Sequence, residues 1–264
     1  MRRLLIPAFL ATLISCSGRQ ENVEVRFDLQ FDGQPITCDT ETAPVSLTDL
    51  RFYVHNLRFV TADQQELPLN LVADGLWQND RGALLDFENG GGACLNGSVE
   101  TNRIVRGSYS GGPISGLAFD IGVPAELNHA DPLRAAPPLA YTEMHWHWAS
   151  GYKFMRAGIE TDNDSFFLHL GSSRCEGTIG DIRGCASANR PTVRLPDFNP
   201  NMHTVVLNLE KLIGAVNLRD GVRTDCMSGP TNEACRGPFA ELGIEFESGI
   251  SIGAASVFKV GLRE

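Results

Sequence analysis

The sequence is poor in positive charge. Its 264 residues contain 22 lysines and arginines against 32 aspartates and glutamates, which gives a formal net charge of −10 at pH 7. Removal of Arg2 and Arg3 with a leader peptide would change this charge from −10 to −12. Proteins that bind nucleic acid need a basic surface, so this deficit argues against a DNA- or RNA-binding function. An acidic surface is compatible with binding of a metal cation or a basic partner.

Long apolar segments and the common catalytic motifs are also missing. Beyond the N-terminal region no apolar segment is long enough to cross a bilayer as a helix. The chain has no Cys-x-x-Cys pair, no haem-attachment motif and no nucleophile elbow. Its glycine run, Gly90-Gly91-Gly92, lacks the strand before and helix after that a phosphate loop requires. Sequence evidence for a haem protein, a serine hydrolase or a nucleotide-binding protein is therefore absent.

The N-terminus has the pattern of an export signal. Two arginines and a short apolar run lead to Leu13-Ile14-Ser15-Cys16, which resembles a bacterial lipobox. We interpret residues 1–15 as a lipoprotein signal peptide and residues 16–22 as a lipidated Cys16 with a polar tether. The acyl chains would hold the protein on the periplasmic or cell-surface face of a bacterial membrane. The alternative is an ordinary cleaved signal in which Cys16 is incidental.

Six cysteines remain once Cys16 is set aside, and an even number in an exported chain predicts disulfides. Fifteen pairings are possible for six cysteines. Sequence proximity favours Cys175–Cys185 and Cys226–Cys235, which leaves Cys38–Cys94. The alternative is a thiolate metal site, which an oxidising compartment disfavours.

Short stretches of alternating apolar and polar residues predict an all-β fold. Val23 to Phe31 is the clearest case, because its odd-numbered positions are apolar and its even-numbered positions are all polar. Further predicted strands are 49–60, 75–77, 83–87, 104–109, 114–123, 166–170 and 256–262, with 204–214 as a strand running into one short helix. Turn residues between them indicate an antiparallel β-sandwich with at most one or two short helices.

We expect one domain over residues 23–264, because no repeat or low-complexity linker divides the chain. Three segments, 128–138, 175–200 and 219–238, are expected to be long loops. The second and third each contain two cysteines, so disulfides would brace them.

The stretch Met144-His145-Trp146-His147-Trp148 contains two of the three tryptophans and two of the six histidines. If 143–148 is a regular strand, Glu143, His145 and His147 share one face, and Met144, Trp146 and Trp148 share the other. The simplest interpretation is a buried Met/Trp face and a solvated Glu/His face. The functional alternatives are a His-x-His metal site or a chemically altered tryptophan.

Composition does not choose among the other histidines. His129 lies in a polar loop, His203 lies near prolines and asparagines, and His55 and His169 lie in apolar strands. A lone histidine in an apolar strand more often bonds a buried carbonyl than a metal. Glu160 and His169 are poorly spaced for the cupin pattern, which argues against a zinc hydrolase.

Several ordered motifs resemble those of one family, the MbnP-like periplasmic copper-binding proteins, described as the four-Cys half of a metal-protein pair. The resemblance covers essentially all of residues 23–264. The motifs are Leu50-Arg51-Phe52-Tyr53-Val54, Gly75-Leu76-Trp77-Gln78, Leu84 to Gly90, Gly122-Val123-Pro124, Leu127 to Pro132, Trp146-x-Trp148, Gly151 to Phe154, His169-Leu170-Gly171-Ser172, Pro191 to Asp197 and Cys226 to Pro230.

The resemblance implies a β-rich fold, one copper ion and no catalytic activity. It also implies that one tryptophan of the Trp-x-Trp motif is oxidised to kynurenine by a partner dihaem enzyme of the MbnH type. Opening the indole ring creates an aniline-like nitrogen that can bind copper beside imidazoles. Copper affinity would then depend on this modification.

His129 and His169 lie in matched motifs, so the resemblance makes them the expected copper ligands. Trp146 and Trp148 form the Trp-x-Trp pair, and either one is a candidate for oxidation to kynurenine. Additional candidate ligands are His55, His145 and His147. If 143–148 alternates regularly, His145 and His147 face away from the tryptophans, and only a bulge would bring them together.

Two other functions fit parts of the sequence. One is a disulfide-braced β-sandwich that serves as a binding or adhesion module without metal, in which the tryptophans belong to the core. The other is a zinc or copper enzyme that uses His145, His147 and His169. The lack of a general base at a plausible spacing weighs against the enzyme.

Overall fold

The computed structural model describes residues 20–95, 97–178, 180–214, 223–253 and 255–263. The predicted signal peptide, Cys16 and the first part of the tether lie outside the described residues. Within the described ranges, no helix is both long and apolar enough to cross a membrane.

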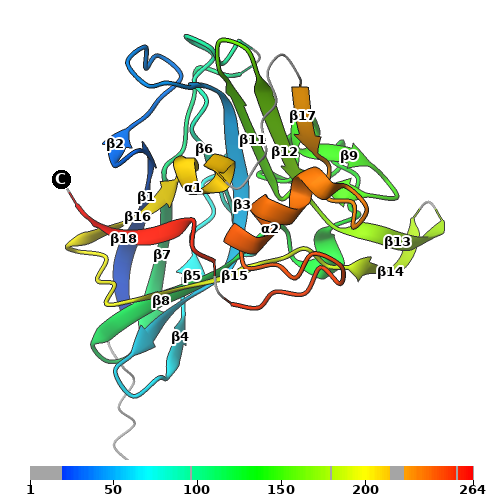
Figure 1. Cartoon of the computed structure of the whole chain (residues 1–264). Helices are drawn as coiled ribbons and strands as arrows, with labels where there is room; N and C mark the ends of the chain where they lie inside the picture. The colour runs from blue at the N-terminus through cyan, green and yellow to red at the C-terminus, as the bar shows by residue number, and fades with distance from the viewer. Residues whose placement is uncertain (1–19, 96, 179, 215–222, 254, 264) are drawn as a thin grey trace, which may run out of the picture.

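The smaller of two main sheets contains the first and last described strands, in the spatial order β18-β16-β1-β7-β5, with β2 paired to β1 (Figure 1). Its strands are β1 (Gln20–Phe31), β2 (Gln34–Pro35), β5 (Asn70–Leu71), β7 (Ile104–Ser110), β16 (His203–Asn208) and β18 (Phe258–Leu262). The alternation predicted for β1 is present, since Val25, Phe27 and Leu29 are all buried. Burial of every second side chain fixes which face of β1 meets the core.

The larger sheet has the order β15-β8-β3-β11-β12-β17, with β4 and β6 paired to β3. Its strands are β3 (Ser46–Thr61), β4 (Glu66–Pro68), β6 (Ala83–Asp86), β8 (Ile114–Ile121), β11 (Met155–Glu160), β12 (Ser165–Leu170), β15 (Thr192–Pro196) and β17 (Arg223–Cys226). Its central strand, β3, is buried on both faces from Leu50 to Val54. The larger sheet is therefore covered on both sides at this point.

Two small hairpins and five short helices complete the described part of the chain. The hairpins are β9 (His145–His147) with β10 (Gly151–Tyr152), and β13 (Ser173–Thr178) with β14 (Asp181–Ser187). The helices are the 3₁₀ turns η1 (Ala125–Leu127), η2 (Thr142–Met144) and η3 (Glu233–Cys235), and the α-helices α1 (Leu209–Gly214) and α2 (Arg236–Glu241). The predicted mostly-β class is confirmed, as is the predicted strand that runs into a short helix, formed by β16 and α1.

Two strand pairs are parallel, although most pairs are antiparallel as predicted. β1 pairs with β16, and β12 pairs with β17, both in the parallel direction. The partners in each parallel pair are far apart in sequence, so the chain has room for the crossover that parallel pairing requires. The alternation of apolar and polar residues within one strand does not show whether its neighbour runs parallel or antiparallel to it.

A cluster of phenylalanine rings joins the two sheets. Phe27 of β1 lies with its ring centroid 6.1 Å from Phe52 of β3 and 5.6 Å from Phe119 of β8. Phe258 of β18 lies 6.0 Å and 5.5 Å from the same two rings. These edge-on contacts form the centre of the sandwich core.

The opposite face of the larger sheet is covered by the segment 122–154. Tyr53 follows Phe52 in β3, so its side chain points away from the sandwich core. Its ring meets Tyr152 at 5.9 Å, and its hydroxyl donates to the carbonyl of Pro138 at 3.0 Å. The histidine- and tryptophan-containing segment therefore packs on the outer face of the larger sheet.

Three disulfides are present, and they are the pairs that sequence proximity predicts: Cys38–Cys94, Cys175–Cys185 and Cys226–Cys235. The first joins the chain before β3 to the loop after β6, two segments separated by 56 residues. The second lies across the β13–β14 hairpin, where Cys175 pairs directly with Cys185.

Some local predictions were wrong. Residues 75–77 form no strand, because the side chain of Asp74 accepts hydrogen bonds from the backbone N–H groups of residues 76, 77 and 78 and closes a turn. Of the three expected loops, 128–138 contains no strand. Residues 175–200 contain most of the β13–β14 hairpin and all of β15, and 219–238 contains β17 and η3. Strands β13 and β14 were not predicted because their hairpin is mostly exposed and lacks an apolar face.

Removal of the Cys38–Cys94 disulfide is expected to destabilise the fold more than removal of Cys175–Cys185. The chain-entropy model gives a loss of about 4 kcal/mol for the larger loop and about 3 kcal/mol for the smaller one. Urea unfolding of Cys38→Ala/Cys94→Ala and of Cys175→Ala/Cys185→Ala measures both losses. Equal losses, or the reverse order, would contradict the expectation.

Candidate metal centre

Trp146 lies against the end of β12. Gly171 follows that strand, and a Cβ atom at this glycine would lie 2.6 Å from Cζ3 of the Trp146 indole. The absence of a side chain at Gly171 therefore lets the indole approach the backbone. The centroid of the indole is 6.2 Å from that of the His169 imidazole. Trp146 and His169, which are 23 positions apart in sequence, thus lie side by side.

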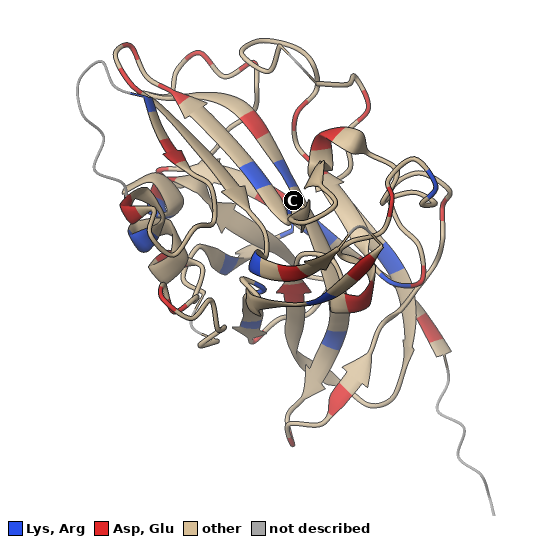
Figure 2. Cartoon of the chain, turned by 90° about the vertical axis from the view of Figure 1, so that its right-hand side faces the viewer, with Lys and Arg blue, Asp and Glu red and all other residues tan. Residues whose placement is uncertain are grey.

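His169 ends a row of polar side chains across the larger sheet. In the strand register Asp86 of β6 pairs with Arg51 of β3, Arg51 with Arg156 of β11, and Arg156 with His169 of β12. Residues directly opposite on neighbouring strands point to the same face. The row runs over the outer face, beneath segment 122–154. Figure 2 shows that acidic and basic residues occur on strands as well as in loops.

Asp49 holds this row together. Both of its carboxylate oxygens accept hydrogen bonds from Arg51 at 3.0 Å, and it also forms an ion pair with Arg156 at 2.7 Å. Asp49 and Arg51 are almost fully buried. Burial raises the pKa of Asp86, whose carboxyl lies farther along the row, to about 7. A buried network of this kind is stable only while every charge keeps its partner.

Arg156 and Lys153 attach the row to the tryptophan segment. Nζ of Lys153 donates to the backbone carbonyl of Glu143 at 2.7 Å, and a guanidinium nitrogen of Arg156 donates to the same carbonyl at 3.3 Å. Glu143 lies in η2, directly before β9. Burial, with Arg156 and Arg51 nearby, lowers the pKa of Lys153 to about 8. The two cations thereby fix the start of the strand that contains Trp146.

The imidazole of His169 is held neutral. Burial, with the nearby charges of Arg156 and Lys153, lowers its pKa from 6.5 to about 4. A neutral imidazole has a free nitrogen lone pair, which is the form that binds metals. His169 is therefore in its metal-binding form at neutral pH.

His129 lies at a second point of the segment, after η1. Its Nδ1 bonds the carbonyl of Trp148 at 2.9 Å, and its Nε2 lies 3.4 Å from Sγ of Cys185. The preceding residue, Asn128, packs against Gly151. A Cβ at Gly151 would lie 2.2 Å from the Asn128 carbonyl oxygen, and its φ of 73° also favours glycine. His129 thus connects the Trp148 backbone with the β13–β14 hairpin.

His145 and His147 differ in their surroundings. The ring of His145 packs edge-on against Tyr152 at 5.0 Å, and its Nε2 is buried without a hydrogen-bond partner. Burial, with His147 and Lys153 nearby, lowers the pKa of His145. His147 is exposed, and its Nε2 lies 3.1 Å from Oγ of Ser150. His145 therefore has a buried ring nitrogen without a hydrogen-bond partner, whereas the corresponding nitrogen of His147 lies beside a hydroxyl.

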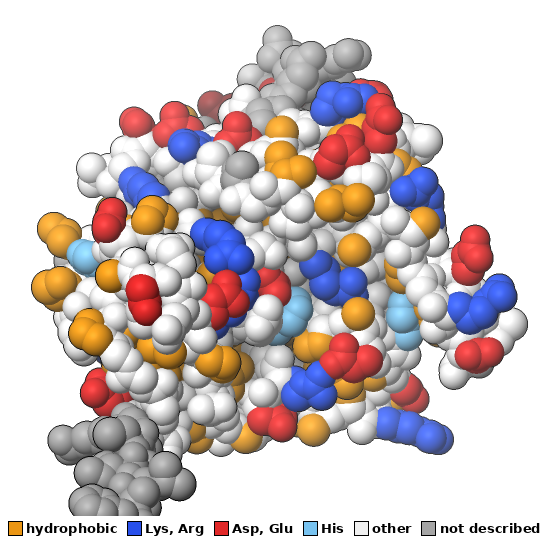
Figure 3. Space-filling model, turned by 90° about the horizontal axis from the view of Figure 1, so that it is seen from below, with side chains coloured by type: hydrophobic (Ala, Val, Ile, Leu, Met, Phe, Trp, Pro, Cys, Tyr) orange, Lys and Arg blue, Asp and Glu red, His pale blue; other side chains and the backbone are white. Residues whose placement is uncertain are grey.

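His55 and His203 have other partners. Nδ1 of His55 bonds the carbonyl of Gly122 at 2.9 Å, and its ring lines a separate cavity with Arg81 and Glu126. Nδ1 of His203 accepts from the backbone N–H of Asn199 at 3.0 Å. The histidines seen from below lie apart from one another, among charged side chains of both signs (Figure 3).

The expected regular strand over 143–148 was wrong. Residues 142–144 form η2, only 145–147 are extended, and the pairing with β10 is irregular at Gly151 and Tyr152. The simple two-face pattern fails as well, since Met144 is fully buried while Trp148 is 40% exposed. Trp146 and His147 both line one cavity of about 440 Å³, together with Cys175 and Met227. Irregular pairing thus lets neighbouring residues face the same space.

The expected ligands do not form a ready-made site. Among the residues that the structure describes, one group of three His, Cys, Asp or Glu side chains has all its ligand atoms within 4.8 Å: His129, Cys175 and Cys185. Its two sulfurs are joined in a disulfide. His169 is near Trp146, whereas the ring of His129 faces the disulfide.

Sequence reasoning missed the groups that position the centre. Asp49, Arg51 and Arg156 are charged residues inside apolar strands, and that contrast was a usable signal for a buried ionic network. Gly171 and Met227 lie within the family motifs, but those motifs do not indicate their role, because it depends on contacts with distant residues.

Together, the fold and this centre define a disulfide-braced β-sandwich with tryptophan and histidine side chains gathered on the outer face of one sheet. The MbnP family profile matches residues 20–228. The chain belongs to the MbnP family, which confirms the resemblance found in its sequence motifs.

A solved structure supports this assignment. MbnP from Methylosinus trichosporium is similar with a TM-score of 0.79 and 26% sequence identity, over 93% of this chain and 100% of that one. No curated protein is similar enough to be matched.

Asp49→Asn is expected to destabilise the protein by about 3–5 kcal/mol, because Arg51 and Arg156 lose their buried carboxylate partner. Urea unfolding measures the loss. Glu126→Gln is the matched control, since Glu126 pairs with Arg81, both side chains are about half exposed, and such exposed pairs contribute about 1 kcal/mol or less. A small effect of Asp49→Asn would show that the network is not required.

The pKa of His169 also predicts a pH dependence. It is about 4 in the folded protein against an ordinary value of 6.5, so the unfolded chain binds more protons between these values. The free energy of unfolding therefore increases as the pH rises from about 4 to 6.5, and it decreases again as the pH falls through the same range. We expect His169→Gln to flatten this part of the curve in urea titrations at stepped pH. An unchanged slope in the variant would assign the effect to other groups.

Proposed function

We propose that this protein is an exported, lipid-anchored copper-binding protein whose site is completed by oxidation of Trp146 to kynurenine. The partner is a dihaem enzyme of the MbnH type. The observation that carries the proposal is the contact between the Trp146 indole and the neutral imidazole of His169 in a chain of the MbnP family. The protein acts in this proposal as a metal-binding protein and not as a catalyst.

The geometry favours Trp146 over Trp148 as the oxidised residue. Trp146 is half-buried beside His169 and lines the cavity that also contains His147. Trp148 is 40% exposed, and its backbone carbonyl is already bonded to His129. An amine created at Trp146 would therefore be close to a metal-binding imidazole from the outset.

The oxidation balances with peroxide as the oxidant. Two equivalents of peroxide are consumed: the C2–C3 bond of the indole breaks, each of the two carbons gains one peroxide oxygen as a carbonyl, and the other oxygen of each peroxide leaves as water. Hydrolysis of the resulting formamide then releases formate and leaves an aryl amine beside an aryl ketone. The dihaem partner supplies the activated oxygen, and this chain supplies the positioned indole.

The donor set suits copper. Imidazole and amine nitrogens are ligands that copper binds readily. The affinity of the protein for copper would therefore show whether the tryptophan has been modified. In this proposal His169 and the opened Trp146 are ligands, and His129 contributes from the adjacent loop. The buried, unpaired Nε2 of His145 makes it the next candidate, ahead of His147 and His55.

The N-terminal part of the proposal rests on sequence. The lipobox-like Leu13-Ile14-Ser15-Cys16 would place the lipid anchor at Cys16. The described domain begins at Gln20 with β1, so a short tether would hold it close to the membrane surface.

Copper binding is expected to require both the partner enzyme and Trp146. Protein co-produced with the dihaem enzyme should carry the kynurenine mass change at Trp146, located by tandem mass spectrometry, and bind one copper per chain. Trp146→Phe should lose both properties. The matched control is Trp148→Phe, which should keep them.

Kynurenine at Trp148 would overturn the choice of residue. Unmodified tryptophans and no bound copper in the co-produced protein would overturn the function, and would favour a binding module without metal.

A further inference from the structure

The Cys175–Cys185 disulfide differs from the other two in its accessibility. Both of its cysteines are half-buried on the β13–β14 hairpin, which extends from the side of the larger sheet (Figure 1). The other four cysteines are at most 4% exposed. A reductant in solution therefore reaches Cys175–Cys185 before either of the buried bonds.

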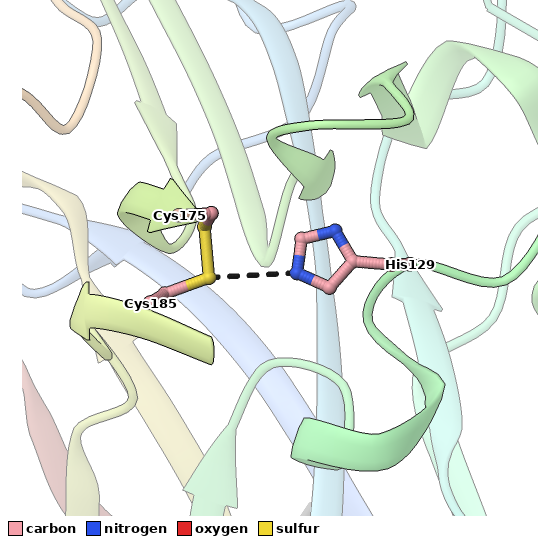
Figure 4. Close-up of side chains that lie close together, drawn as sticks. All are labelled: His129, Cys175 and Cys185. Carbon is pink, nitrogen blue, oxygen red and sulfur yellow. Dashed lines mark hydrogen bonds between the residues drawn. A yellow bond between two sulfur atoms is a disulfide. The ribbon is translucent and has the colours of Figure 1, made fainter. Parts of the chain in front are cut away.

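The imidazole of His129 is oriented toward this bond. The Trp148 carbonyl can only accept a hydrogen bond, so Nδ1 of His129 carries the proton and donates at 2.9 Å. The lone pair is then on Nε2, which lies 3.4 Å from Sγ of Cys185 (Figure 4). Histidine ligands of metals are commonly fixed in this way, with the far N–H held by a carbonyl.

Asn128 supports the same orientation. Its Oδ1 accepts from the backbone N–H of Tyr152 at 3.3 Å, which turns its amide nitrogen toward Nε2 of His129 at 3.2 Å. The amide therefore donates to the Nε2 lone pair, and a cation bound at Nε2 would replace this hydrogen bond. The imidazole is therefore held from both sides, independently of the hairpin. A change in the bond between the two sulfurs would leave the ring where it is.

The three ligand atoms are close enough to share one ion. Nε2 of His129 and the sulfurs of Cys175 and Cys185 lie within 4.8 Å of one another. In the disulfide the sulfurs are bonded to each other and cannot serve as thiolates. The β-ladder pairs Cys175 directly with Cys185, so the backbone keeps the sulfurs near each other after the bond is broken.

We propose that reduction of Cys175–Cys185 opens a metal site, formed by the two thiolates and Nε2 of His129, for a soft cation of the Cu(I) class. Two thiolates and one imidazole suit such an ion. The disulfide form is closed to metal and the dithiol form is open, so the redox state of the hairpin sets its affinity.

The reduction balances with a dithiol as the reductant. The dithiol gives two electrons to the sulfur–sulfur bond and becomes a disulfide itself, while each cysteine sulfur gains one electron and binds a proton as a thiol. Binding of the cation displaces these protons without further electron transfer.

This site is distinct from the proposed kynurenine centre. It needs no opened indole. It shares His129 with the candidate ligands of that centre, and because only Nε2 has a free lone pair, His129 would bind an ion at one of the two sites at a time. Cys175 also lines the cavity that contains Trp146 and the thioether of Met227. A cation bound by the reduced hairpin would therefore lie next to the proposed copper centre.

The test uses the full chain produced without the partner enzyme, so that its indoles are intact. The folded protein is treated with dithiothreitol, freed of it without oxygen, and alkylated in a sample for peptide mass spectrometry. Among the six cysteines that form disulfides, we expect label on Cys175 and Cys185 alone. Cu(I) alone, titrated against a chromogenic chelator, should bind one equivalent at least about tenfold more tightly than it binds to the unreduced protein.

Three variants separate this site from other sources of affinity. Cys175→Ser/Cys185→Ser and His129→Gln should lose the gain in affinity, whereas His203→Gln, which changes a histidine of β16, should keep it. Equal binding before and after reduction, or full binding by the serine variant, would overturn the proposal. So would labelling of the four buried cysteines, because the bond must open in the folded protein.

If Cu(I) does not bind to the reduced hairpin, the proposed function is not contradicted. Copper binding by the kynurenine-containing protein is measured separately, with the disulfide intact.

Discussion

The buried carboxylate of Asp49 is the constraint on which the candidate metal centre depends. It binds Arg51 and Arg156 at once, and thereby keeps three charges inside the larger sheet that would otherwise be very costly to bury. Arg156, held in this way, donates with Lys153 to the Glu143 carbonyl and fixes the start of β9. The same cations help to keep His169 neutral. The position of Trp146 and the metal-binding form of its neighbour thus follow from one ion-paired row.

In both proposals the metal site is incomplete as the chain folds, and chemistry on side chains would complete it. The indole of Trp146 lies beside an imidazole but offers no good ligand until its ring is opened. The sulfurs of Cys175 and Cys185 lie beside another imidazole but offer no thiolate until their bond is broken. One change is an oxidation and the other a reduction, and both act at the rim of the same cavity. In both proposals metal affinity follows the redox history of the protein.

Sequence patterns predicted those features that depend on neighbours along the chain. The alternation in β1, the strand that runs into α1 and the two short-range disulfides all involve residues close in sequence. Predictions were wrong where a side chain, or a contact with residues distant in sequence, changed the local backbone structure. Asp74 turned residues 75–77 away from a strand, η2 replaced the first half of the strand expected over 143–148, and the exposed β13–β14 hairpin gave no apolar signal. The motifs of the MbnP family placed His129 and His169 in the candidate set, which single-residue reasoning could not do.

By itself, the sequence determined the β-rich class, the disulfide pairs and the residues from which a metal centre could be made, because composition, alternation and ordered motifs are properties of the chain. Only the tertiary structure decided which of those residues meet. It brought Trp146 to His169 across the gap left by Gly171, turned Nε2 of His129 toward Cys185, and assigned His55 to a separate cavity. These choices depend on strand register and on segment 122–154 packing over the larger sheet, and neither is encoded in the spacing of residues along the chain.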